Sequence, residues 1–252
     1  MDYIKFGNGA ENFVILPGLS IHSVMRYSQA IGEAYKDFTD KYTVYVFDRA
    51  KSISEGYTVN DMAADTAQKM KSLGIQKADV FGASQGGMIA LYMAIDYPQL
   101  VNKMILASTL AKPNDTFNEV LEEWVDLAEK KKETELISSF VDRVYSEQTL
   151  SAYRDVLVSS EAGITDEEYL RFLILAKACR TYDCSAKIPD IKCPVFVIGC
   201  DGDRVATAQA SSQIAKALNC KVYIYGKSYG HAVYDEAPDY KQRCLDFLKE
   251  NN

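Results

Sequence analysis

The stretch Val80-Phe81-Gly82-Ala83-Ser84-Gln85-Gly86-Gly87 decides how the rest of this chain is interpreted. A short apolar run leads into a Gly-x-Ser-x-Gly pentapeptide, and helix-forming residues follow from Met88 onward. This order predicts a strand, a sharp turn and a helix, with Ser84 at the tip of the turn. Gly82 and Gly86 stand where so tight a turn leaves no room for a side chain. Ser84 is therefore the first candidate for a functional residue.

The rest of the chain alternates between apolar runs that predict strands and segments whose apolar residues recur at helical spacing. This alternation predicts an α/β fold, with a mostly parallel sheet covered by helices on both faces. Asn60 is expected to cap the helix at 59–73, and Gly7-Asn8-Gly9 to form a hairpin turn. The predicted strands are 2–6, 12–16, 43–47, 78–81, 104–107, 194–199 and 221–225, and the helices outside the insertion described next include 23–38, 59–73, 207–218 and 239–249.

About 75 residues, from 112 to 187, interrupt this alternation and contain no convincing strand. They predict four helices, at 118–131, 135–145, 147–158 and 167–182, with Asp115 and Thr165 as the caps of the first and the last. We expect the last helix to return the chain to the sheet. The predicted division is therefore a core of residues 1–111 plus 166–252 and an inserted helical cap of residues 112–165.

Length and charge limit the kinds of partner. A chain of 252 residues is long enough for one α/β domain with an insertion. The net charge is −7 and the basic residues are scattered, so the chain lacks the basic stripe that phosphate backbones require. The run Lys130-Lys131-Lys132 is flanked by glutamates and predicts a solvated helix face. We expect no nucleic acid partner, and a monomer or a homodimer.

Six cysteines without a Cys-x-x-Cys pair, together with only two histidines, offer little material for a metal site. We expect these cysteines to be reduced and mostly buried, and we expect neither a metal nor a cofactor. The sequence shows no signal-peptide pattern and no apolar stretch long enough to cross a bilayer. The expected location is the cytoplasm, with no membrane partner.

A serine hydroxyl is a weak nucleophile at neutral pH, so Ser84 needs a base within hydrogen-bond reach. Histidine usually fills this role, and the chain offers only His22 and His231. His231 follows the last predicted strand, at the carboxyl edge of the sheet where Ser84 also emerges. We therefore expect His231 to be the base. His22 lies at a helix start after the second strand, and we expect it to contact substrate.

A carboxylate should hold and charge-balance the base. Asp201 and Asp203 both follow the strand that ends at Gly199. We favour Asp203 and keep Asp201 as the alternative. Asp48 and Arg49, at the end of another strand, are expected to form a local ion pair.

Backbone N–H groups must also stabilise the negative charge that develops on a substrate oxygen. The N–H of Gln85, next to Ser84 at the start of a helix, is one expected donor. The N–H of Leu19, in the turn that follows the second strand, is the other, and Gly18 permits the close approach. In the cap, Trp124 and Phe140 are the predicted substrate contacts. Five cap aromatics either line a pocket or pack against one another: Phe117, Trp124, Phe140, Tyr145 and Tyr153.

These residues resemble the α/β-hydrolase fold family with a helical cap. The order Ser84, Asp203, His231 is that family's order of nucleophile, acid and base. Further resemblances are Phe47-Asp48-Arg49, Tyr97-Pro98, Pro194-Val195 and Gly230-His231-Ala232 with Glu236 and Pro238. Two features depart from the family pattern: Pro17-Gly18 replaces a His-Gly pair, and Gly202 stands where the acid usually falls, which we interpret as a one-residue insertion before Asp203.

The resemblance implies a sheet of about eight strands, an active site under the cap, and no cofactor or metal. It implies a serine hydrolase that cleaves a small carboxylic ester or a related acyl bond through an acyl-enzyme. The same triad serves thioesterases, amidases and C–C bond hydrolases, so these stay open as alternatives. A hydrolase-like protein that senses a small molecule with little turnover is a further alternative.

Overall fold

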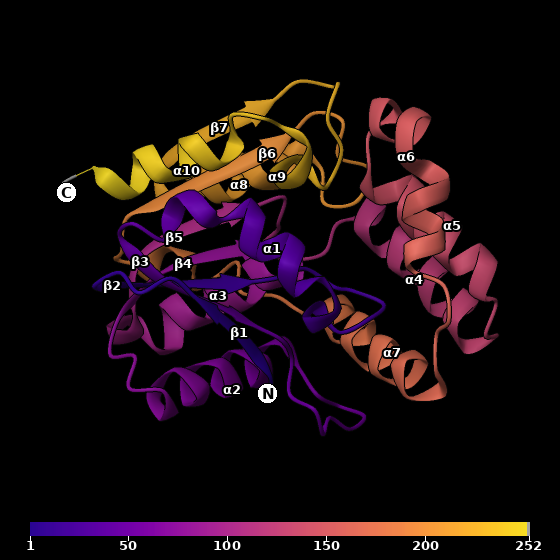
Figure 1. The fold of residues 1–252 in the computed structure, drawn as a ribbon, viewed down its shortest axis with the longest axis horizontal. Coiled ribbons are helices and arrows are strands. Elements are labelled where there is room, and N and C mark those ends of the chain that lie inside the picture. The colour runs from indigo at the N-terminus through magenta and orange to yellow at the C-terminus, as the bar shows by residue number, and fades with distance from the viewer. Residues whose placement is uncertain (251–252) are drawn as a thin grey trace.

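A seven-stranded sheet forms the centre of the computed structural model, which describes residues 1–250 (Figure 1). Its order is β1-β3-β2-β4-β5-β6-β7, with β1 antiparallel to β3 and every other pair parallel. The predicted α/β fold with a mostly parallel sheet is confirmed, with seven strands in the described part where about eight were expected. The strands are β1 (Tyr3–Phe6), β2 (Glu11–Leu16), β3 (Tyr42–Phe47), β4 (Ala78–Ala83), β5 (Val101–Ala107), β6 (Val195–Cys200) and β7 (Lys221–Tyr225).

The predicted hairpin at Gly7-Asn8-Gly9 is wrong, because β3 lies between β1 and β2. Strand β2 pairs with β3 on one side and β4 on the other, so neither of its edges is left for β1. A Cβ atom on Gly9 would lie 2.2 Å from the backbone nitrogen of Tyr42. Because it lacks a side chain, Gly9 allows the connection from β1 to β2 to pass close to the backbone at the start of β3. It does not form a hairpin turn between paired strands.

Helices cover both faces of the sheet (Figure 1). Alternate side chains of the strands point to opposite faces, so the sheet has two apolar cores. One core lies against α2, α3 and α8, and the other against α10 and the segment that contains α1. The helices are α1 (Ser28–Ala34), α2 (Val59–Ser72), α3 (Gln85–Asp96), α4 (Asp115–Glu129), α5 (Glu133–Val144), α6 (Glu147–Ser160), α7 (Asp166–Arg180), α8 (Ala208–Leu218), α9 (Val233–Glu236) and α10 (Tyr240–Lys249).

The ends of some helices differ from the predictions because side-chain caps compete locally. Helix α2 is capped by Thr58, which forms a reciprocal capping box with Asp61, rather than by Asn60. Helix α4 is capped by Asn114, one residue before the expected Asp115. The helix predicted at 23–38 is divided into 3-10 turns at Val24–Tyr27 and Lys36–Phe38 around a short α1.

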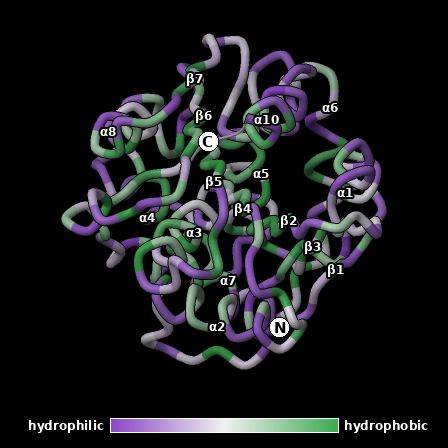
Figure 2. The backbone as a smooth tube through the Cα atoms, turned by 90° about the vertical axis from the view of Figure 1, so that its left-hand side faces the viewer, coloured by the Kyte–Doolittle hydropathy of each residue, from purple (hydrophilic) through white to green (hydrophobic). Residues whose placement is uncertain are grey.

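Four helices, α4 to α7, stand between β5 and β6, and α4, α5 and α6 lie to one side of the sheet (Figure 1). Helix α7, which begins after the predicted cap Thr165, packs against α4 and runs back toward the core. Figure 2 shows the hydrophobic parts of the chain gathered where β4, β5 and β6 cross the middle of the molecule. We propose that residues 112–165 form a separate cap, and that α7 joins this cap to the core.

Candidate active site

Ser84 lies on the turn between β4 and α3, and its backbone is held in an unusual conformation. Its φ is 51° and its ψ is −118°, in a region that residues other than glycine seldom adopt. The Ser84 N–H donates to the Ala107 carbonyl at 2.8 Å, and Thr109 Oγ1 donates to the Ser84 carbonyl at 2.7 Å. A Cβ atom on Gly86 would lie 1.8 Å from the carbonyl oxygen of Leu16. The tight strand-turn-helix predicted from the sequence is present.

His231 follows β7 and is fixed by a carboxylate from the loop after β6. Its Nδ1 lies 2.9 Å from both Oδ1 and Oδ2 of Asp203, and both residues are buried. Asp203 Oδ1 also accepts the N–H groups of Val205 and Ala206, at 2.8 and 2.9 Å. Asp201 is exposed, and its backbone N–H donates to the Tyr225 carbonyl at 2.9 Å, while its side chain has no hydrogen-bond partner among residues 1–250. The geometry therefore pairs His231 with Asp203 and leaves Asp201 apart.

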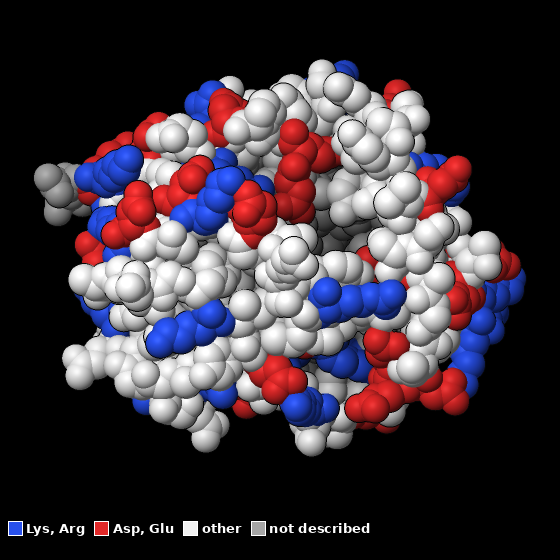
Figure 3. All heavy atoms as spheres, in the orientation of Figure 1, with Lys and Arg blue, Asp and Glu red and all other residues white. Residues whose placement is uncertain are grey.

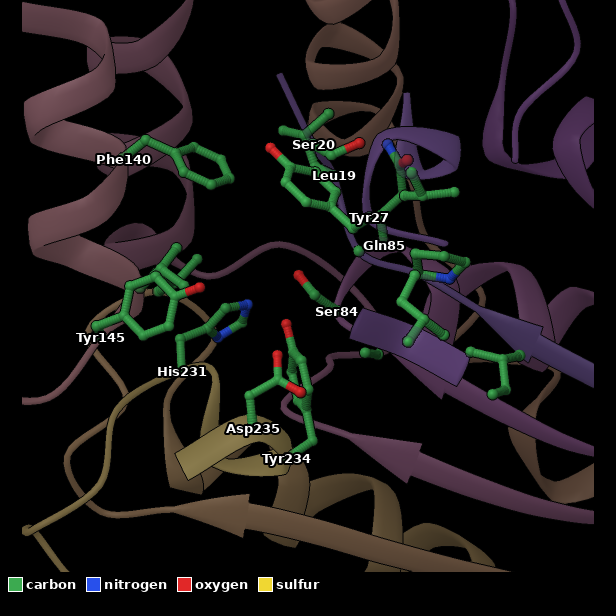
Figure 4. Close-up of a pocket in the computed structure, with 18 of the residues that line it drawn as sticks. Leu19, Ser20, Tyr27, Ser84, Gln85, Phe140, Tyr145, His231, Tyr234 and Asp235 are labelled. Carbon is green, nitrogen blue, oxygen red and sulfur yellow. The ribbon is translucent and has the colours of Figure 1, made fainter. Parts of the chain in front are cut away.

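Ser84 and His231 line the same cavity, and Figure 4 shows the serine hydroxyl and the imidazole directed into one space. The hydrogen bonds within residues 1–250 include none between Ser84 Oγ and His231. Such catalytic hydrogen bonds often reach full strength only when substrate is bound. The fold thus brings a hydroxyl, an imidazole and a carboxylate together at one edge of the sheet.

The loop expected to complete an oxyanion hole lies against Ser84. A Cβ atom added to Gly18 would come within 3.3 Å of Ser84 Cβ, so this glycine permits the close approach. Leu19 and Gln85 both line the cavity, and Gln85 is the first residue of α3. Their backbone N–H groups are the donors that we propose for the substrate oxygen.

Arg49 connects the two sides of this loop arrangement, and sequence reasoning missed its role. Its Nε donates to Gln85 Oε1 at 3.1 Å, and its Nη2 donates to the Pro17 carbonyl at 2.5 Å. Burial lowers the pKa of Arg49 to about 10, which leaves the guanidinium charged at neutral pH. The predicted ion pair with Asp48 is wrong: the Asp48 carboxylate accepts from Ser23, from Arg171 and from the backbone N–H of Arg49, whereas the Arg49 guanidinium is directed to Gln85 and Pro17. The sequence did contain a signal for this role, because Arg49 is a charged residue just after β3, at the carboxyl edge of the sheet where Ser84 also lies.

The side chain of Gln85 ties this region to α7. Its Nε2 donates to the Leu175 carbonyl at 2.9 Å and to Cys179 Sγ at 3.0 Å. Burial raises the pKa of the Cys179 thiol to about 11, so the thiol is protonated at neutral pH. The residue beside Ser84 is therefore anchored both to Arg49 and to the helix that leads out of the insertion.

The cavity has a volume of about 600 Å³ and a mainly apolar wall. The predicted contacts Trp124 and Phe140 both line it, and their rings contact each other at a tilt of 38°, with centroids 4.7 Å apart. The same two side chains therefore line the cavity and pack against each other. Of the other cap aromatics, Phe117 and Tyr145 also line the cavity, whereas Tyr153 is 61% exposed on the surface.

His22 does not face this cavity, so the structure does not support its predicted contact with substrate. The ring is buried, with Nδ1 2.7 Å from Glu168 Oε1 and Nε2 2.8 Å from the Glu161 carbonyl oxygen. Each ring nitrogen therefore faces an oxygen of a residue far along the chain. His22 instead connects the loop after β2 to the end of α6, through Glu161, and to the first turn of α7, through Glu168.

Several polar cavity residues were not predicted. Tyr27 and Glu161 line one part of the wall, and Tyr234 and Asp235 another. Asp235 carried a usable signal, because it follows His231 by four residues, about one helical turn. Tyr27 and Glu161 come together only through folding, 134 positions apart.

Two further features concern residues 1–250, the part of the chain that the structure describes. That range holds no group of three or more His, Cys, Asp or Glu side chains placed to bind a metal ion. None of its helices combines the length and the apolar character that crossing a bilayer requires.

Comparison with known proteins identifies the family. Residues 12–238 match the family model described as alpha/beta hydrolase fold. The chain belongs to the α/β-hydrolase fold family. The resemblance found in the sequence is thereby confirmed, and the chain is an enzyme of a hydrolase family.

Two relatives indicate the range of reactions in this family. The chain is 26% identical over 231 residues to a proposed carbamate hydrolase, RutD, of Pseudomonas savastanoi pv. phaseolicola, with 83% of this chain and 85% of that protein covered. It is 24% identical over 198 residues to the 2-hydroxy-6-oxo-6-phenylhexa-2,4-dienoate hydrolase of Comamonas testosteroni, with 72% and 66% covered.

Two solved structures share the fold along almost the whole chain. MGS-M2, an α/β-hydrolase enzyme from a Medee basin deep-sea metagenome library, superposes with a TM-score of 0.89 at 23% identity, covering 100% of this chain and 94% of that one. The enol-lactonase from Burkholderia xenovorans LB400 gives a TM-score of 0.82 at 19% identity, with 99% and 96% covered. At these identities, the superpositions establish the fold alone.

Proposed function

We propose that this α/β-hydrolase is a serine hydrolase that cleaves a small carboxylic ester or a related acyl bond through a Ser84-His231-Asp203 triad. The observation that carries this proposal is the convergence of Ser84 and His231 on one cavity, with His231 Nδ1 2.9 Å from Asp203. A carboxylate in this position holds the imidazole in the tautomer whose Nε2 is free to accept a proton.

In the proposed reaction, Ser84 Oγ attacks the carbonyl carbon of the substrate while His231 Nε2 takes the hydroxyl proton. The N–H groups of Leu19 and Gln85 donate to the resulting oxyanion, a contribution of about 3 kcal/mol for a well-placed donor. His231 returns the proton to the leaving group, and an acyl-enzyme on Ser84 remains. Water then attacks this ester, His231 takes the proton of the water, and release of the acid restores Ser84.

The cavity supports a small, largely apolar acyl substrate, since about 600 Å³ is within the usual range for pockets that bind small molecules. The relatives include one named for carbamate hydrolysis and one named for a hexadienoate hydrolase. A carbamate presents a carbonyl carbon to the same nucleophile, so it falls within the related acyl bonds of this proposal. We keep thioester, amide and C–C cleavage as alternatives to be separated by assay.

The test is reaction with a fluorophosphonate probe, which labels an activated serine covalently. Wild-type protein should be labelled and should hydrolyse short p-nitrophenyl esters, and Ser84→Ala should lose both properties. Ser108 and Ser20 provide matched controls: Ser108 follows β5 and is buried, and Ser20 lines the same cavity. Equal labelling of wild type and Ser84→Ala, or stoichiometric binding without product release, would contradict the proposal and favour a binding protein.

A further inference from the structure

Two carboxylates stand in the wall of an otherwise largely apolar cavity. Asp235 comes from α9 on the core side, and Glu161 from the end of α6 on the insertion side. In Figure 4, the Asp235 carboxylate points into the space shared by the Ser84 hydroxyl and the His231 ring. The Asp235 side chain remains 52% accessible, so the cavity presents this carboxylate to a bound molecule.

The cavity wall supplies little positive charge to balance these groups. Within residues 1–250, the side chains that line it include no lysine and no arginine. Asp235 forms an ion pair with Lys241, whose Nζ lies 3.5 Å from Asp235 Oδ1. That ammonium also donates to the Tyr234 carbonyl and lies 5.4 Å from the centre of the Tyr35 ring, so it is shared among three groups.

Glu161 has a neutral partner in the cavity wall. Tyr27 donates its hydroxyl proton to Glu161 Oε1 at 2.5 Å. Burial, followed by the bond to this carboxylate, raises the pKa of the Tyr27 phenol, so Tyr27 stays neutral and does not cancel the charge. Arg26 is the cation next along the chain, but its side chain is exposed and does not line the cavity.

A carboxylate that faces a mainly apolar cavity attracts a cation more strongly than it would in bulk water, because the effective dielectric constant beside it is lower. The surrounding aromatic rings, including Trp124, Tyr145 and Tyr234, add faces that attract cations. A ligand with an apolar body and a cationic end would match both features of the wall.

We propose that Asp235 and Glu161 make this enzyme selective for substrates that carry a positively charged ammonium group. The substrates would be ammonium-bearing esters or related acyl compounds, preferred over neutral molecules of equal shape and over carboxylate-bearing ones. This inference rests on the proposed serine hydrolase reaction. It adds the charge of the substrate, which neither the fold nor the triad determines.

The test compares substrates that differ only in charge. One set consists of p-nitrophenyl esters of a hexanoyl chain that ends in trimethylammonium, in tert-butyl or in carboxylate. The second set is acetylthiocholine and its carbon isostere, in which tert-butyl replaces trimethylammonium. The first set places the cation on the acyl side and the second on the leaving-group side, so the results also assign the orientation of the substrate.

The measured quantity is the ratio of kcat/KM for the cationic substrate to that for its neutral isostere. We expect Asp235→Asn or Glu161→Gln, whichever carboxylate lies beside the cation, to lower this ratio about tenfold, with the other variant lowering it less. Asp246→Asn removes one negative charge from the exposed face of α10, and it should leave the ratio unchanged. Thermal unfolding of each variant shows whether the fold is retained.

A ratio that stays within about twofold of wild type in both Asp235→Asn and Glu161→Gln would overturn the inference. So would cleavage of the carboxylate-bearing ester as efficiently as the cationic one. Loss of activity in Ser84→Ala together with an unchanged ratio would refute the charge selectivity and leave the proposed function standing. Retained hydrolysis in Ser84→Ala would refute the proposed function instead, and calorimetric binding of tetramethylammonium to wild type and Asp235→Asn would then test the carboxylates alone.

Discussion

The two halves of the cavity are built in different ways. On the core side, Ser84, Asp203 and His231 follow β4, β6 and β7, and backbone contacts at the strand ends fix their positions. On the insertion side, the wall consists of side chains such as Phe140 and Glu161 on helices that pack against one another. We therefore expect bond cleavage to depend on the residues at the strand ends, and the choice of substrate shape to depend on the packing of the insertion helices.

Polar contacts join these halves along a seam. His22 bonds Glu168, Asp48 bonds Arg171, and Glu236 accepts N–H groups from both Ser146 and Gly230. The Glu236 bridge connects the insertion to the residue directly before His231, because Gly230 precedes His231.

Figure 3 shows a recess in the surface with acidic side chains gathered beside it. If the two halves have separate roles, substitutions in each should change different measured quantities.

The largest effect is expected at the carboxylate of the core half. Asp203→Asn should lower kcat about 10⁴-fold with little change in KM, because an amide cannot hold His231 in the required tautomer. Steady-state kinetics on a short p-nitrophenyl ester would measure this. Asp201→Asn is the matched control, since Asp201 is exposed, and it should change kcat by less than about twofold. A larger loss in Asp201→Asn than in Asp203→Asn would exchange the two assignments.

The next effect concerns Arg49, which donates hydrogen bonds to the proposed oxyanion loop at Pro17 and to the side chain of Gln85. Arg49→Met should lower kcat about 100-fold with a small change in KM, because the loop donors are displaced from the developing charge. Arg171→Met is the control, since Arg171 contacts Asp48 at the same strand end but does not bind the loop. Arg171→Met should lower the free energy of unfolding but leave kcat nearly unchanged. Equal losses of kcat in the two variants would show that the Arg49 effect is only structural.

A smaller effect is expected on the insertion side. Phe140→Leu keeps an apolar side chain but removes the ring that lines the cavity beside Trp124. The preference for long over short acyl chains in kcat/KM should change about tenfold, with kcat for the shortest ester nearly unchanged. Phe172→Leu alters the neighbouring ring, which does not line the cavity, and should leave the preference intact. A fall in kcat for every ester in Phe140→Leu would contradict the separation of roles.

The smallest effect concerns the seam and depends on pH. Burial raises the pKa of Glu168, but the hydrogen bonds from His22 and Thr165 outweigh it, and the net pKa lies below the usual value. A carboxylate with a lowered pKa in the folded state stabilises the protein above its unfolded pKa of about 4.3, and this is lost as the pH falls through the folded pKa.

Glu168→Gln should therefore lower the free energy of unfolding at neutral pH by about 1 kcal/mol, the size of a single ion pair, and the difference should shrink as the pH falls from the unfolded pKa of about 4.3 toward the lower folded pKa. Urea unfolding at several pH values would measure it. Glu167→Gln changes the adjacent, exposed glutamate and is the control. A difference that grew as the pH fell would contradict the sign of the lowered pKa.

The core half was predictable because local patterns determine it. Glycines on either side of Ser84, an aspartate after β6 and a histidine after β7 each follow a strand whose apolar run is visible in the sequence. Parallel strands then bring their carboxyl ends to one edge of the sheet. The antiparallel pairing of β1 with β3 was missed because a glycine-rich connection has the same local signature in a hairpin and in a crossover.

The insertion half and the seam were not predictable in the same way. Tyr27 and Glu161 meet across 134 positions, and His22 and Glu168 across 146, with no repeating pattern to link them. Trp124 and Phe140 were predicted to contact substrate, but helical spacing did not distinguish lining the cavity from packing against each other. In the structure, these two side chains do both.

The side chain of Gln85 links the turn that carries Ser84 to helix α7. Its amide reaches Leu175 and Cys179 on α7, while its backbone N–H is the proposed partner of the substrate oxygen. A displacement of α7 would therefore strain the peptide unit beside the nucleophile. Gln85 would thus be affected both when the insertion opens to admit a larger molecule and when the transition state is bound. A variant selected for wider access should therefore also show a slower chemical step.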